Sequence, residues 1–201
     1  MEYDFLVDTY ETERLKTLSM WSTFRDQDLP IRPRPLDKRD RNGLEHMVHQ
    51  CVSENRWFST MLGIDSGASP LPQAETRIEF IKRYAEDSAK RLAELRKKDK
   101  SWWEDIVPFF DVQRTRSWVL LRRIAHTAHH RAEQGMLLRL LGRENYSVYG
   151  PSIDSGCLAD RGALTIYPYA DVQSLIEGES AGGRKIKLPG PMEPCTERPD
   201  P

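Results

Sequence analysis

Hydrophobic positions in the first 141 residues repeat at helical spacing in four segments, so the chain is predicted to be all-α. The clearest segment covers about 41–62, where an apolar residue recurs every three or four positions. Its apolar stripe consists of Leu44, Met47, Val48, Cys51 and Val52. The other segments cover about 5–24, 74–97 and 116–141. Stretches rich in Pro, Gly and Asp separate the four, which is typical of the loops in a four-helix bundle.

The fourth segment is apolar on two sides. At about 100° per residue, its apolar residues fall on two roughly opposite faces. One face holds Leu120, Leu121, Ile124 and Ala128, and the other holds Val119, Leu137 and Leu141. A helix buried on two sides belongs in the middle of a bundle or at a subunit interface. We expect both, in a four-helix bundle that forms a homodimer through this region.

The pattern changes after residue 145. The remainder is loop-like, with one short strand expected over 164–169 and one short helix over 170–178. This part has too few apolar residues to form a second domain. We therefore predict a bundle over 1–150 and an irregular C-terminal extension over 151–201, which packs on the bundle or on the dimer partner.

Charge and hydropathy narrow the function classes. Lys and Arg number 30 against 31 Asp and Glu, so nothing in the formal net charge of -1 favours nucleic acid or an anionic membrane as a partner. No apolar run approaches the roughly 20 residues that span a bilayer. The first segment is acidic and lacks the apolar core of a signal peptide. We expect a soluble, cytoplasmic protein that acts on a small molecule.

The three cysteines are an odd number with no close pair. Neither a disulfide framework nor a CxxC metal or redox site is expected from this spacing. Cys51 lies in the apolar stripe and is predicted to be a core residue. Cys157 and Cys195 are the pair that the C-terminal region could join, but a reducing compartment disfavours that bond.

All five histidines fall in two short windows. His46 and His49 lie in the second helical segment, and His126, His129 and His130 lie in the fourth. His126 and His130 are four residues apart, so both imidazoles can reach one metal ion from the same helix face. His129 points about 60° away from His126 and is the weaker ligand candidate.

Helix geometry also selects one histidine of the second segment. With the stripe centred on Leu44, His49 lies on its flank at roughly 140° and His46 at roughly 200°. His49 is therefore expected to face a groove beside the core, and His46 to face solvent. Neutral imidazoles of His49, His126 and His130 would form a facial triad for a divalent transition metal, with open positions for water or substrate. Alternatively, the histidines of the fourth segment form only a polar edge at a dimer seam.

Two longer motifs surround these histidines. The run HTAHHRAEQGMLLRLLG, followed by YSVYGP, resembles the fourth-helix signature of the DinB/YfiT-like superfamily, H-x2-HHR-GQ with a leucine-rich stretch and a YG turn. The run HQCVSENRWF resembles the second-helix pattern of that family, with His49, Glu54 five residues on and Trp57 eight on. The resemblance covers roughly residues 1–151.

This resemblance implies a four-helix bundle, commonly dimeric, whose histidine triad binds nickel, zinc or a related ion. Matched by position, the triad falls on His49, His126 and His130, the three that helix geometry also selects. One departure matters, because the usual Gly-Gln after HHR is here Ala132-Glu133. The substrate preference of other members therefore does not carry over.

Members of the family resemble metal-dependent hydrolases and thiol S-transferases, including those that use bacillithiol or mycothiol. A three-histidine ion can activate a bound water, or hold the thiolate of a low-molecular-weight thiol. Glu133, and less plausibly Glu54, is the candidate catalytic base, and His129 is either a donor to the site or structural. The alternative is a non-catalytic, stress-related metal-binding dimer whose site is closed by a fourth ligand such as His129 or Glu133.

Aromatic residues precede the fourth segment and follow it. They either wall an apolar substrate pocket or cap one end of the bundle. They are Trp102, Trp103, Phe109, Phe110, Tyr146 and Tyr149.

Overall fold

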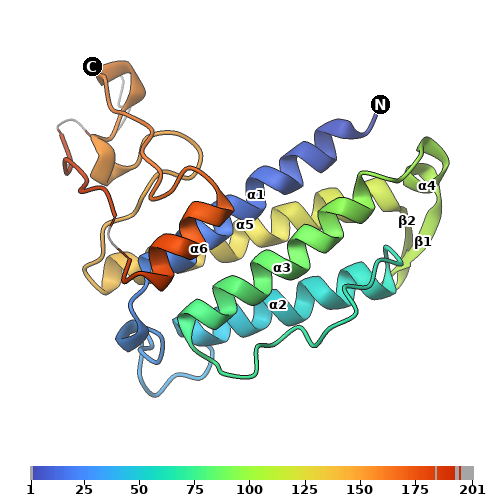
Figure 1. The fold of residues 1–201 in the computed structure, drawn as a ribbon, viewed down its shortest axis with the longest axis horizontal. Helices are drawn as coiled ribbons and strands as arrows, with labels where there is room; N and C mark the ends of the chain where they lie inside the picture. Colours follow the sequence, from blue (N-terminus) through green and yellow to red (C-terminus); the bar gives the residue numbers. More distant parts are fainter. Residues whose placement is uncertain (1, 184, 193–194, 196–201) are drawn as a thin grey trace.

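The computed structural model describes residues 2–183, 185–192 and 195 (Figure 1). Four long helices lie alongside one another, which confirms the all-α prediction, and the remaining elements are short. The long helices are α1 (Asp4–Thr23), α2 (Gly43–Thr60), α3 (Arg77–Leu95) and α5 (Arg116–Leu140). The short elements are η1 (Asp26–Asp28), α4 (Lys100–Glu104), β1 (Ile106–Phe109), β2 (Val112–Thr115), η2 (Ile153–Ser155), η3 (Ala159–Arg161) and α6 (Val172–Ser180). No helix among the described residues is long and apolar enough to cross a membrane.

Polar side chains fix where α2, α3 and α5 begin, whereas α1 has no side-chain cap. The Asn42 side chain accepts from the Glu45 backbone N–H at 2.8 Å, and the Glu45 carboxylate accepts from the Asn42 N–H at 3.0 Å. The Thr76 and Thr115 side chains cap α3 and α5 by accepting from the backbone N–H groups of Glu79 and Trp118, without the reciprocal bond. These caps satisfy backbone donors that no helical carbonyl can reach, so each of these three helices starts at a defined residue.

The core consists of two apolar clusters along the bundle. The cluster at the hairpin end includes Trp57, Phe58 and Trp103, and the cluster at the other end includes Trp21, Met47 and Phe80. On α2, the apolar positions of the two clusters are separated by Glu54, whose carboxylate is completely buried. A layer of buried charge therefore interrupts the hydrophobic core.

The buried face of α2 differs from the predicted stripe. Met47 and Cys51 are buried as expected, but Val52 is 41 % exposed and His46 is only 5 % exposed. The prediction that His46 faces solvent is therefore wrong. The helix is rotated so that its polar residues also face the bundle, because partners on neighbouring helices satisfy them; Gln50 accepts from the Trp21 indole at 3.2 Å.

A short helix and a hairpin that were not predicted close one end of the bundle. Strands β1 and β2 pair antiparallel, with Ile106 opposite Thr115. Each strand has only four residues, too few for a convincing period-two pattern. Val107 and Phe109 point into the core, so the hairpin covers this end of the helices.

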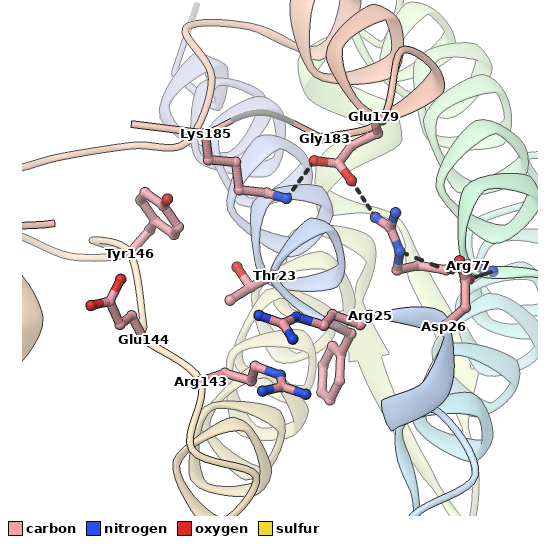
Figure 2. A pocket seen from close by; sticks show the side chains of 12 residues that line it. Thr23, Arg25, Asp26, Arg77, Arg143, Glu144, Tyr146, Glu179, Gly183 and Lys185 are labelled. Atoms are coloured by element: carbon pink, nitrogen blue, oxygen red, sulfur yellow. Dashed lines mark hydrogen bonds and ion pairs between the residues drawn. The ribbon is translucent and has the colours of Figure 1, made fainter. Parts of the chain in front are cut away.

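The C-terminal extension lies at the opposite end of the bundle from the hairpin (Figure 1). The predicted helix is present as α6, which packs on α1 and α3 and buries Leu175. Glu179 binds Lys185 at 2.7 Å and pairs with Arg77 of α3 (Figure 2). The predicted strand over 164–169 does not form, because the backbone there pairs only at Ile166, which accepts from the Ser147 N–H at 2.9 Å.

The expectation that the cysteines form no disulfide is also wrong. Cys157 and Cys195 form a disulfide, with their Cα atoms 5.1 Å apart. The prediction against this bond relied on sequence spacing and compartment, whereas the path of the extension brings the two residues together. Cys51 is buried among apolar side chains of the core, as predicted.

Candidate metal centre

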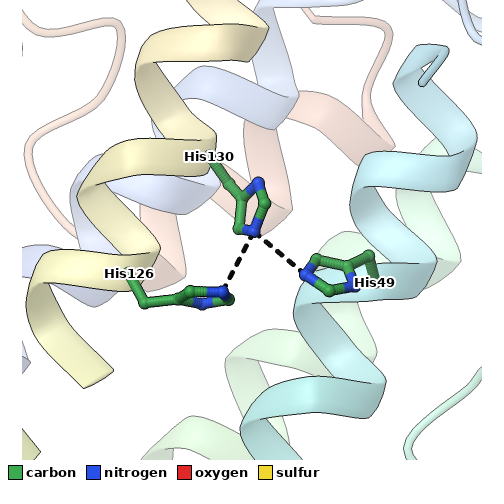
Figure 3. A group of neighbouring side chains, drawn as sticks. All are labelled: His49, His126 and His130. Atoms are coloured by element: carbon green, nitrogen blue, oxygen red, sulfur yellow. Dashed lines mark hydrogen bonds between the residues drawn. The ribbon is translucent and has the colours of Figure 1, made fainter. Parts of the chain in front are cut away.

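Three imidazoles from two adjacent helices converge on one point (Figure 3). His49 projects from α2, and His126 and His130 project from α5, which packs against it. The Nε2 atom of His130 lies 2.9 Å from Nε2 of His49 and 3.3 Å from Nε2 of His126. The ligand atoms of all three lie within 4.8 Å of one another. The structure thus brings together the three histidines that the sequence selected.

These separations suit ligands of one ion. Zinc binds imidazole nitrogen at about 2.0–2.1 Å, so two such ligands at 90–109° are about 2.9–3.4 Å apart. The measured distances of 2.9 and 3.3 Å fall within that range. His130 is buried, whereas His49 and His126 are half-buried, so a bound ion would remain accessible from one side.

The surroundings keep these imidazoles neutral. Burial, and then the positive charge of Arg41, lower the pKa of His49 to about 4. Burial and Arg123 lower the pKa of His126 to about 3. Burial also lowers the pKa of His130, although the neighbouring Glu133 opposes the shift. Near neutral pH, each ring therefore has a lone pair to offer an ion.

A carboxylate contacts the central histidine of the three. Glu133 Oε2 lies 2.7 Å from Nδ1 of His130, on the opposite side of the ring from the converging Nε2 atoms. Burial opposes the charge of Glu133, but the hydrogen bond with His130 outweighs it, and the pKa of Glu133 is lowered. A carboxylate that accepts the Nδ1 proton leaves Nε2 free to bind metal, an arrangement typical of metal sites.

Arg123 has the opposite effect on His126. Its Nη1 lies 3.2 Å from Nδ1 of His126, and a guanidinium can only donate. In the tautomer that accepts this bond, His126 carries its proton on Nε2. Binding an ion through Nε2 requires the other tautomer, with the proton on Nδ1, and so gives up the hydrogen bond from Arg123. The charge of Arg123 is balanced by Glu54, 3.5 Å away, which limits its repulsion of a cation.

Aromatic side chains flank the centre on the hairpin side. Trp57 stacks on His126 with ring centroids 5.5 Å apart, and Phe109 packs edge-on against Trp57 at 5.2 Å. Phe110 follows Phe109 and is mostly exposed. Trp103 is instead buried in the core. The hairpin aromatics thus lie beside the histidines as well as capping the bundle.

The other two histidines occupy different environments. His46 Nδ1 is buried, has no hydrogen-bond partner among the described residues, and lies 3.9 Å from Glu133 Oε2. His129 is exposed, with Nε2 3.4 Å from Glu133 Oε1. The sequence interpretation missed both His46 and Arg123. Two signals point to them: His46 is four residues before Gln50 on the buried face of α2, and Arg123 is three residues before His126.

Glu54, the weaker candidate base, is a core residue. Its carboxylate accepts from Tyr10 at 2.7 Å, from Tyr84 at 3.0 Å and from Arg91 at 3.3 Å. These donors occupy its oxygens inside the bundle. The carboxylate is therefore not available to a substrate at the histidine centre.

The sequence model of the DinB family matches residues 7–156, three quarters of the chain, and this span contains the three histidines and Glu133. The chain belongs to the DinB family. The match ends inside the C-terminal extension, so α6 and the residues around it are additional to the part that this DinB protein shares with the family.

Two solved structures have the same fold as this DinB protein. A DinB-like protein from Bacillus cereus is 18% identical, with a TM-score of 0.63 over 72% of this chain and 95% of the other. The DinB-like protein YjoA of Bacillus subtilis is 16% identical, with a TM-score of 0.55 over 70% of this chain and 94% of the other. None of the curated proteins matches this chain in sequence.

Proposed function

We propose that this DinB protein is a metal-dependent enzyme acting on a small molecule, with a divalent ion held by His49, His126 and His130. The observation that carries this proposal is the convergence of three Nε2 atoms, one of them on a ring whose Nδ1 faces a carboxylate. Imidazole donors suit zinc and nickel, which are the expected ions.

When bound, the ion would supply a Lewis acid that lowers the pKa of a water or of a low-molecular-weight thiol, as hydrolysis or thiol S-transfer requires. Among the described residues, no fourth imidazole, thiol or carboxylate joins the group of His49, His126 and His130, although His130 also belongs to a second group of possible ligands with His46 and Glu133. Open positions support an enzyme over the alternative, a non-catalytic metal-binding protein with a closed site.

Glu133 has two proposed roles. Its Oε2 engages His130 and so positions that ligand. Its Oε1 lies on the exposed side near His129, where it can accept a proton from a substrate. The second role, that of catalytic base, requires the substrate proton to come within about 2.6–3.2 Å of this oxygen.

A homodimer is also proposed. Two large apolar side chains, Trp118 and Leu121, lie exposed near the start of α5, outside the groove described below, and pack against a second copy in this proposal. Light scattering on the purified protein would give twice the monomer mass, and a monomer at micromolar concentration would contradict the proposal.

The decisive experiment is the metal content of untagged protein, measured by plasma mass spectrometry. We expect close to one zinc or nickel per chain in the wild type, lost in His126→Ala. The matched control is His129→Ala, which removes an exposed histidine from the same helix and should keep its metal. No metal in the wild type, even after reloading and desalting, would overturn the proposal.

Activity then separates the two function classes. The metal-loaded wild type should turn over substrates in a screen of hydrolysis and thiol-transfer reactions, and His126→Ala should not. The non-catalytic alternative would be favoured if the protein holds one metal per chain, X-ray absorption shows four protein ligands, and no substrate turns over.

A further inference from the structure

A groove of about 300 Å³ adjoins the metal centre on the side away from the hairpin aromatics. Its walls come from the loop that precedes α2, from the first turn of α2 and from the second half of α5. We call it the Arg41 groove, after the arginine at the end of the loop. His46 and Glu133 both line it, so it reaches the carboxylate that contacts His130.

Arg41 brings an unpaired positive charge to this groove. The neighbouring loop charges are paired, Arg39 with Asp37 at 2.6 Å and Asp40 with Arg34 at 2.7 Å. Arg41 lies close enough to Glu45 to lower the pKa of that carboxyl, but its guanidinium makes no direct hydrogen bond or ion pair with the described residues. It is therefore free to bind an anionic group, for which its fork of N–H donors is well suited.

His46 offers a second polar contact in the groove. The residue is only 5 % exposed, yet its Nδ1 atom has no hydrogen-bond partner in the described part of the chain. The nearest carboxylate oxygen, on Glu133, is 3.9 Å away, which is too far for a hydrogen bond. Buried polar atoms are normally satisfied, so this nitrogen indicates a missing partner, for which a ligand hydroxyl is suited because it can both donate and accept.

Part of the groove wall is apolar. Met136 and Leu140 line the groove and remain 64 % and 67 % exposed. A hydrocarbon chain lying against them would remove apolar surface from water. The groove therefore presents a cation, an apolar wall and an unsatisfied buried nitrogen in one cavity.

We propose that the Arg41 groove is the substrate pocket of the metal centre and that it selects a small amphipathic organic anion. The carboxylate or phosphate of the ligand binds Arg41, its hydrocarbon part lies on Met136 and Leu140, and a hydroxyl group meets His46 Nδ1. This inference rests on the proposed function, because Glu133 links the groove to the histidine centre.

A larger cavity at the C-terminal extension offers a contrast. It has a volume of about 440 Å³ and is lined by four cationic side chains. Three of these already have carboxylate partners: Arg77 and Lys185 pair with Glu179 (Figure 2), and Arg143 pairs with Asp28. Arg25 lines the same cavity and supplies a matched control for Arg41.

The test measures how simple probes bind to the full chain. Calorimetry gives the affinity, and changes in amide chemical shifts show which residues each probe contacts. The probes are hexanoate, hexan-1-ol and hexylamine. Hexanoate should bind most tightly and shift residues around Arg41 and His46. Arg41→Gln should weaken hexanoate binding about tenfold, the effect expected for a hydrogen bond to a charged group. Arg25→Gln should leave it unchanged.

A hydroxylated probe tests the His46 contact. 6-Hydroxyhexanoate should bind more tightly than hexanoate to the wild type, and His46→Phe should abolish that preference. Binding of hexanoate to His126→Ala shows that the probe occupies the groove rather than the ion. Equal binding of hexanoate and hexylamine, or weakening by Arg25→Gln instead of Arg41→Gln, would overturn the proposal.

The two proposals fail separately. One metal per chain without hexanoate binding would overturn the groove alone. Hexanoate binding that depends on Arg41, in a protein that takes up no metal, would overturn the proposed function while the binding site itself stands.

Discussion

Two polar clusters lie side by side in this bundle, joined by Arg123, and they differ in how far their polar atoms are satisfied. The Glu54 cluster is closed, because its carboxylate accepts from two tyrosines and Arg91 and also faces Arg123. In the histidine centre, three nitrogen atoms point at one another, and His46 Nδ1 has no partner among the described residues.

The difference separates a structural cluster from the proposed binding site. Donors surround both oxygens of Glu54, so this carboxylate needs no further ligand inside the core, although the Nε atoms of Arg91 and Arg123 have no partner among the described residues. In the histidine centre, neutral imidazole nitrogens converge, and too few N–H donors lie nearby to satisfy all of their lone pairs. Such an arrangement is stabilised by a cation, and the groove beside it by a ligand with a hydroxyl group.

The largest expected effect comes from removing the carboxylate of the Glu54 cluster. Glu54→Ala should lower the free energy of unfolding by about 3–5 kcal/mol, because it leaves Arg91 and Arg123 buried without their carboxylate. Urea denaturation measures this loss. Glu94→Ala, which removes an exposed carboxylate paired with Lys97, should change stability by less than about 1 kcal/mol. Equal stability of the two variants would show that the Glu54 cluster is not a structural element.

A smaller effect is expected at the carboxylate of the histidine centre. Glu133→Gln should weaken metal binding about 10- to 100-fold, because the amide no longer holds the His130 proton as strongly, while the unfolding free energy stays close to wild type. Competition with a chromophoric chelator measures the affinity. Glu86→Gln, on the surface of α3, is the control. Unchanged affinity in Glu133→Gln would mean that this carboxylate does not position the ligand.

The smallest expected effect is on pH dependence. Burial lowers the pKa of His46 to about 4, against 6.5 in the unfolded chain. Between these values the unfolded state binds more protons, so stability falls as the pH decreases from 6.5. In chelator-treated wild type, the free energy of unfolding should therefore fall by on the order of 1 kcal/mol between pH 6.5 and 5 because of His46. His46→Phe should not show this decrease. The comparison is made by urea denaturation at each pH, and identical slopes for both proteins would contradict it.

Local patterns located most of the elements. The periodicity that predicts helices at 5–24, 41–62, 74–97 and 116–141 depends only on neighbours within two turns, and the observed helices agree to within three residues at each end. The pairing of His126 with His130 is equally local. Longer-range features were missed, namely the hairpin at Ile106–Phe109 and Val112–Thr115 and the bond between Cys157 and Cys195.

The sequence by itself determined the helices, the all-α class and three histidines able to share an ion, because helical spacing converts residue numbers into faces. Only the tertiary structure decided how α2 is rotated. That rotation depends on partners from other helices, such as Trp21 for Gln50 and the donors around Glu54, which make buried polar residues favourable. For the same reason, His46 faces the groove with an unpaired nitrogen, and Arg123 contacts both the core and the centre.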